Sequence, residues 1–140
     1  MKKLFICVVI GTLMSPSCRE SSLVEKFYPL DIKNSSSTII GFYIAGKDAE
    51  NVYPDTTLPD VKPPLIFVDP NDLFTVDSRE PWSEYIAGMP GDTLSIYIFD
   101  RDTINQIPWA EIVTNNNILK RFDVSSDDVS NGNSTIEYVN

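Results

Sequence analysis

The sequence predicts a mainly β fold, a β-sandwich of about seven short strands with two short capping helices. Short runs of β-forming residues recur along the chain and are separated by clusters of turn residues. One of these runs, residues 92–102, has apolar side chains on both faces, and two similar Pro-Trp segments begin patterns typical of short helices. A strand that is apolar on both faces belongs in the interior of a sheet, so the other strands are expected to surround it.

The central strand is expected at Asp92–Asp102, with the sequence DTLSIYIFDRD. Side chains alternate between the two faces of a strand. Leu94, Ile96 and Ile98 therefore share one face, and Tyr97 and Phe99 share the other. We expect both faces to be covered by other parts of the chain.

Other strands are predicted on both sides of this segment, and a Pro-rich stretch, NVYPDTTLPDVKPP, interrupts them. Its prolines exclude both a helix and a central strand. An Asp-Pro-Asn-Asp sequence between the third and fourth predicted strands is typical of a hairpin turn. The predicted strands are Tyr28–Lys33, Thr38–Ala45, Leu65–Val68, Leu73–Val76, Ile118–Val124 and Thr135–Val139.

Two short helices are predicted at Pro81–Ile86 (PWSEYI) and Pro108–Val113 (PWAEIV). Proline suits the first helical position because its φ is fixed near the helical value and its missing N–H needs no partner there. Each tryptophan shares one face with the apolar residues three and four positions later. These helices are expected to pack on the sheet through Trp82 and Trp109.

A second architecture stays open at this point. The segments around each helix are long enough to cross between parallel strands. The helices would then be crossovers in an α+β fold instead of caps on a sandwich.

The N-terminal residues are typical of an export signal. Lys2 and Lys3 precede an 11-residue apolar run, LFICVVIGTLM, which is too short to span a bilayer, since about 20 residues are needed. Small and polar residues and then Cys18 follow, and the segment resembles a bacterial lipoprotein signal, although Ser15 stands where leucine is usual. The resemblance implies a signal peptide at residues 1–17 and a lipidated Cys18 bearing palmitate-type acyl chains. An ordinary cleaved signal that leaves a free thiol is the alternative.

The expected organisation is therefore a signal peptide at residues 1–17, a tether at 18–26 and a single β-rich domain at 27–140. With 20 acidic and 11 basic residues, the chain has a formal net charge of −9. This charge disfavours nucleic acid and anionic lipid headgroups as partners. The chain contains no histidine, which excludes His-dependent triads and histidine metal ligands.

Acidic residues are the only abundant reactive type. Asp100 and Asp102 are expected on one face at the end of the central strand, and Asp123, Asp127 and Asp128 come later in the chain. Carboxylates of this kind can bind calcium, or can act in pairs in a glycosidase. A solvated acidic surface is what a protein of this charge shows in any case, and we expect that role here, so we predict no metal, cofactor or catalytic residue.

Aromatic residues offer another possible site. Tyr53, Trp82 and Trp109 could form a platform on which a sugar ring stacks. Tryptophans in short amphipathic helices more often belong to the core, and we expect that role here.

Three threonines follow aspartate in a repeated pattern, Asp-Thr followed by Thr, Leu or Ile. The pattern resembles the O-glycosylation signal of exported Bacteroidetes proteins. This resemblance implies Thr56, Thr93 and Thr103 as acceptors, with Thr56 in the Pro-rich stretch the best placed. Asp-Thr is also an ordinary turn pair.

Several segments together resemble a family of small uncharacterised lipoproteins from gut Bacteroidetes. They are the lipoprotein-like start, YPDTTLP, DTLSIYIFDRDT, the two PW-x-E turns and ILKRFDVSSDDV. The resemblance implies a cell-envelope protein, lipid-anchored in the outer membrane, and no particular activity. We therefore expect a non-enzymatic binding module for a protein or glycan, with a calcium-dependent binder or carboxylate-based hydrolase as the alternative.

Overall fold

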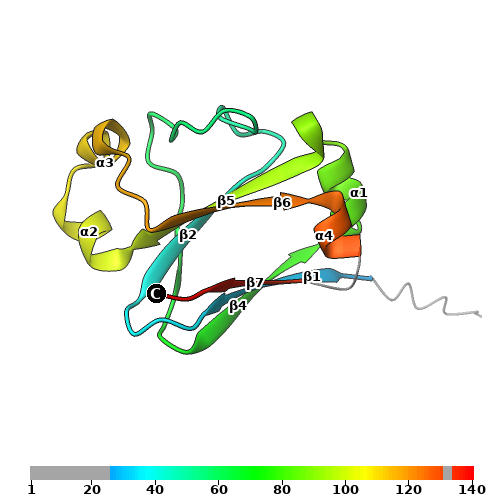
Figure 1. Cartoon of the computed structure of the whole chain (residues 1–140), viewed down its shortest axis with the longest axis horizontal. Coiled ribbons are helices and arrows are strands. Elements are labelled where there is room, and N and C mark those ends of the chain that lie inside the picture. The colour runs from blue at the N-terminus through cyan, green and yellow to red at the C-terminus, as the bar shows by residue number, and fades with distance from the viewer. Residues whose placement is uncertain (1–25, 131–133) are drawn as a thin grey trace, which may run out of the picture.

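The computed structural model describes residues 26–130 and 134–140, which form two β-sheets with short helices at both ends (Figure 1). The elements in chain order are β1 (Tyr28–Asn34), β2 (Ile40–Ala45), β3 (Ile66–Val68), β4 (Asp72–Ser78), α1 (Trp82–Ala87), η1 (Pro90–Asp92), β5 (Thr93–Asp100), α2 (Arg101–Gln106), α3 (Trp109–Asn115), β6 (Lys120–Ser125), α4 (Ser126–Ser130) and β7 (Thr135–Tyr138).

The strands form a three-stranded sheet in the order β4-β1-β7 and a four-stranded sheet in the order β3-β2-β5-β6. The predicted β-sandwich with short helices is confirmed. β5 lies inside the larger sheet, antiparallel to both β2 and β6, and its residues 94–99 are all buried. The prediction of a central strand that is apolar on both faces is therefore also confirmed, although the strand ends at Asp100.

One face of the larger sheet packs against the smaller sheet. The alternation expected from sequence places Leu94, Ile96 and Ile98 of β5 in this layer, together with Leu30 and Ile32 of β1. Helices α1 and α4 close one end of the sandwich (Figure 1), where Ile86, Met89 and Val129 join the same cluster.

The opposite face of the larger sheet carries a second apolar cluster. Tyr97 and Phe99 of β5 pack there with Ile104 of α2, Ile112 of α3 and Leu58 of the Pro-rich stretch. The larger sheet is thus buried on both faces, which explains the near-continuous apolar sequence of β5.

Both predicted helices are present, as α1 and α3. Pro81 and Pro108 occupy their N-cap positions instead of the first helical position. Gly88 ends α1, and Asn116 ends α3 in the left-handed conformation. Helices α2 and α4 were not predicted, because each is short and follows directly from the end of a strand.

Two expectations about connectivity are wrong. β3 and β4 do not form a hairpin, since β3 pairs with β2 and β4 pairs with β1 in the other sheet. The α+β alternative also fails: β4 and β5, which flank α1, lie in different sheets, and β5 and β6, which flank α2 and α3, are antiparallel. Among the described strands the parallel pair is β1 with β7, the first strand with the last.

Asn34 joins the two sheets at one corner. It is fully buried at the end of β1, and its side-chain amide donates to the carbonyl oxygens of Val68 at 3.0 Å and Thr38 at 2.8 Å. Its Oδ1 accepts from the N–H of Ser36 at 3.0 Å and from the Ser36 hydroxyl at 2.7 Å. A single side chain therefore pairs backbone groups of the β1–β2 turn with the end of β3.

We expect Asn34→Ala to lower the free energy of unfolding by about 3 kcal/mol, because several buried backbone groups lose their partner. Chemical denaturation with Ser37→Ala as the control measures this, since Ser37 is exposed in the same turn. A loss no larger for Asn34→Ala than for the control would mean that the corner is not held by this amide.

Ile96→Asn is expected to lower the free energy of unfolding by at least about 4 kcal/mol, since it buries an unpaired amide in the middle of β5. Val61→Asn is the matched control, because Val61 is 78% exposed. Denaturant titration of both variants measures this difference. Equal free energies of unfolding for the two variants would contradict the position of Ile96 in the core.

Candidate functional site

A pocket of about 320 Å³ lies at the end of the larger sheet, beside α2. Its walls come from the end of β5, from α2 and its C-cap, and from the chain between α3 and β6. The lining residues are Asp100, Thr103, Ile107, Asn117, Ile118 and Leu119. Because it combines a carboxylate, an amide and an apolar wall, it can accept a small polar group such as a hydroxyl pair.

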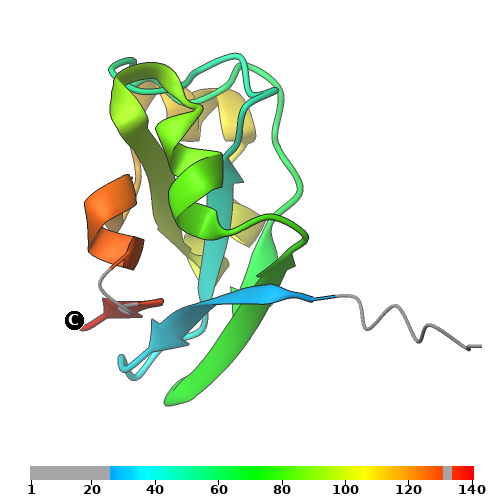
Figure 2. The same cartoon turned by 90° about the vertical axis from the view of Figure 1, so that its right-hand side faces the viewer.

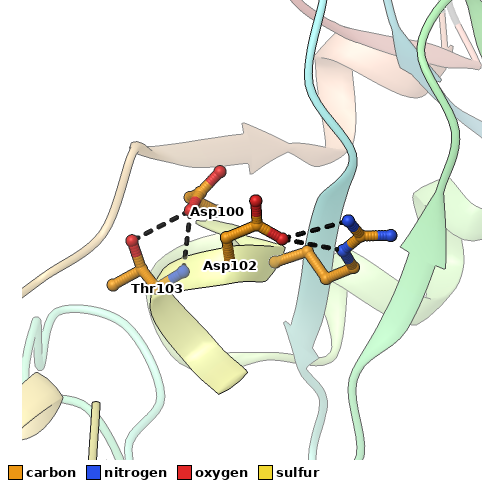
Figure 3. A network of polar contacts seen from close by, with 4 residues as sticks. Asp100, Asp102 and Thr103 are labelled. Atoms are coloured by element: carbon orange, nitrogen blue, oxygen red, sulfur yellow. Dashed lines mark hydrogen bonds and ion pairs between the residues drawn. The ribbon is translucent and has the colours of Figure 1, made fainter. Parts of the chain in front are cut away.

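Asp100 is held in place because it belongs to two elements of the fold. It is the last residue of β5 and the N-cap of α2, and its Oδ1 accepts from the Thr103 N–H at 2.8 Å and from the Thr103 hydroxyl at 2.9 Å (Figure 3). Aspartate is among the preferred N-cap residues because it satisfies a free N–H of the first turn. The carboxylate is therefore held in a fixed orientation at the pocket.

The expectation that Asp100 and Asp102 share one face is wrong. Asp102 lies in the first turn of α2 and pairs with Arg101 at 3.0 Å (Figure 3). The chain leaves the extended conformation after Asp100, so the period of two no longer applies.

Asp123 and Asp128, which come later in the chain, have different hydrogen-bond partners. Asp123 of β6 pairs with Arg121 at 2.7 Å and accepts from the Ser95 hydroxyl at 2.8 Å. Asp128 accepts from the Ser125 hydroxyl and N–H, which holds the pKa of its carboxyl below its usual value. Within residues 26–130 and 134–140 no three histidine, cysteine or acidic residues group closely enough to hold a metal ion.

A second pocket, of about 250 Å³, lies at the other end of the sandwich beside Trp82. The Trp82 indole N–H donates to the Tyr28 carbonyl at 2.9 Å, and its ring meets that of Tyr85 edge-on. The residues around this pocket are Tyr28, Pro29, Pro81, Trp82, Ser83, Val129, Ser130 and Ser134.

The two tryptophans pack against the core, as expected, and they belong to different clusters. Trp109 packs against Phe99 and donates its indole N–H to the Pro59 carbonyl at 2.8 Å, which fastens the Pro-rich stretch to α3. Because Trp82 and Trp109 lie against opposite faces of the larger sheet, they do not form one sugar-stacking platform.

Sequence reasoning missed a cation–aromatic cluster on the outer face of β5 and β6. The Arg121 guanidinium lies 5.6 Å from the centre of the Tyr97 ring and 6.0 Å from that of Tyr53. Burial raises the pKa of the Tyr97 hydroxyl, and this hydroxyl has no hydrogen-bond partner among the described residues. The sequence hardly indicates this cluster, because Arg121 and Tyr97 become neighbours only through the pairing of β5 with β6.

The three candidate glycan acceptors differ in accessibility. Thr56 is exposed between β2 and β3, whereas Thr93 and Thr103 are half-buried. The hydroxyl of Thr93 donates to the Gly91 carbonyl at 2.7 Å, and that of Thr103 donates to Asp100. Of the three candidates, Thr56 is therefore the most accessible to an external enzyme.

The predicted signal peptide (1–17) and the lipidated Cys18 lie outside the described residues, as does nearly all of the tether. None of the described helices is long and apolar enough to cross a membrane. Comparisons with models of protein families, with curated proteins and with solved structures each found no match.

We expect calcium and EDTA to leave the melting temperature unchanged, because Asp100, Asp102 and Asp123 have separate protein partners. A ligand that binds only the folded state raises stability. A melting scan with and without each additive tests this, and a calcium-dependent rise that Asp100→Asn removes would contradict it.

Proposed function

We propose that this chain is a non-enzymatic lipoprotein of the bacterial cell envelope. In this proposal the residues 1–17 are removed, Cys18 carries the lipid, and the β-sandwich is held at the outer membrane as a binding module for a protein or glycan.

The observation that carries the proposal is the order of segments at the N-terminus. Two lysines, a short apolar run, small and polar residues and a cysteine come directly before a polar stretch that leads into β1. This order resembles a bacterial lipoprotein signal, which implies that Cys18 is the lipid attachment point. The apolar run is too short to hold the chain in a bilayer by itself.

The domain supports a binding role through the two pockets at its ends. The pocket at Asp100 offers a fixed carboxylate and the Asn117 amide beside apolar side chains. Most ligand sites combine a mainly apolar wall with a few fixed polar groups of this kind.

Intact mass tests the anchor. We expect the protein isolated from its native membranes to have lost residues 1–17 and gained a lipid-sized mass, while a Cys18→Ala variant shows no such gain. A chain that is cleaved without lipid, or not cleaved, would contradict the anchor.

The same spectra test the glycan acceptors. We expect a sugar-sized increment that Thr56→Val removes, with Thr57→Val as the matched control in the adjacent position.

The binding role itself is contradicted by turnover of a polysaccharide or peptide that a single carboxylate substitution abolishes.

A further inference from the structure

β4 forms a free edge of the smaller sheet. It pairs with β1 along all seven of its residues, and among the described strands none lies on its other side (Figure 2). A free edge presents backbone N–H and C=O groups that a second strand can pair with.

The register shows which groups of β4 face outward. Asp31 of β1 donates its N–H to the Ser134 carbonyl at 2.6 Å, on the β7 side, so the residues on either side of it in β1 face β4. Thr75 lies opposite Asp31 and therefore turns its N–H and C=O away from β1. Leu73 and Asp77, two residues to either side, do the same.

One of these outward groups already has a partner. The Leu73 N–H donates to the carboxylate of Asp72 at 2.8 Å. The N–H groups of Thr75 and Asp77 and three carbonyl oxygens remain along the edge, enough to pair with a short extended segment.

The side chains of β4 define the chemistry of such a segment. Leu73 is 51% exposed and Phe74 is 40% exposed. Asp72 and Asp77 are exposed on either side of them, and β4 contains no basic residue.

We propose that the β4 edge binds an extended, basic and apolar segment of a partner protein by antiparallel strand addition. Main-chain hydrogen bonds supply the affinity in this mode, and the facing side chains supply the specificity. The matching segment begins with a basic residue opposite Asp77, followed by two variable residues. Two apolar residues come next, opposite Phe74 and Leu73. A basic residue opposite Asp72 ends the segment.

A second copy of the chain fits this edge less well. If two β4 edges pair through hydrogen bonds with the longest overlap, Thr75 of one copy lies opposite Thr75 of the other. Asp77 of each copy then lies opposite Leu73 of the other. Asp72 of each copy then faces Ser78 of the other, and no opposite charges meet. The charge of the edge therefore favours a basic partner over self-association.

The test uses the full chain and a peptide with the order Lys-Thr-Thr-Val-Val-Lys, flanked by glycines, in a fluorescence binding assay. We expect saturable binding, and a drop of about tenfold or more when the third and fifth peptide residues are N-methylated on the backbone, because these residues face β4. Methylation of the second and fourth residues, whose N–H groups point away, is the matched control and should leave binding intact.

The protein is varied in parallel. Thr75→Pro removes an outward N–H that β1 does not use, a placement that edge strands tolerate, and should abolish binding while the melting curve stays cooperative. Thr75→Val keeps the N–H and should bind as the unmodified chain does. Asp77→Lys should weaken binding about two- to fivefold, and a peptide with glutamate at its first position should restore it.

The proposal is overturned if the peptide does not bind, or if backbone methylation of either pair of residues has the same effect. A concentration-dependent dimer that Thr75→Pro dissociates would overturn it in favour of self-association. Cys18→Ala should bind the peptide unchanged, so the outcome here is separate from that of the lipid anchor.

Discussion

The constraint on which the structure depends is that β5 is apolar on both faces and must be shielded from water on both. At about 25 cal/mol per Å² of apolar surface, neither face can be left open without a large loss of stability. The smaller sheet covers the face with Ile96, and α2, α3 and the Pro-rich stretch cover the face with Tyr97. The layered arrangement in Figure 1 follows from this requirement.

Because a separate sheet covers β5, the described part of the chain has unpaired edge strands along one side of the sandwich. The chain turns between β3 and β4 without pairing them, so each becomes the edge of a different sheet. Asn34 pairs the backbone at the corner where the two sheets meet. The two edge strands carry exposed apolar residues, and one of them, β4, is the strand for which we propose a partner.

The pocket at Asp100 also derives from the end of β5. The same carboxylate that ends the strand caps α2, and this change of direction brings Ile107 and Asn117 to the pocket. Asp100 was singled out from the sequence, but as part of an acidic cluster. Asp102 and Asp123 have their own partners, so the carboxylate stands beside amide and apolar groups instead of other acids.

The sequence by itself determined the strands, the two helices that begin with Pro-Trp, and the face on which each residue of β5 lies, because these follow from side-chain periodicity and local backbone preferences. It singled out Asp100 as one of several acidic residues, without predicting a site there, and did not indicate the residues that line the pocket beside it. Only the tertiary structure decided which strands pair, that β3 and β4 part into different sheets, and that Arg121 meets Tyr97. Pairing depends on contacts between residues distant in the chain, for which a turn sequence such as Asp-Pro-Asn-Asp is not sufficient, since it specifies a reversal of direction and not the partner of each strand.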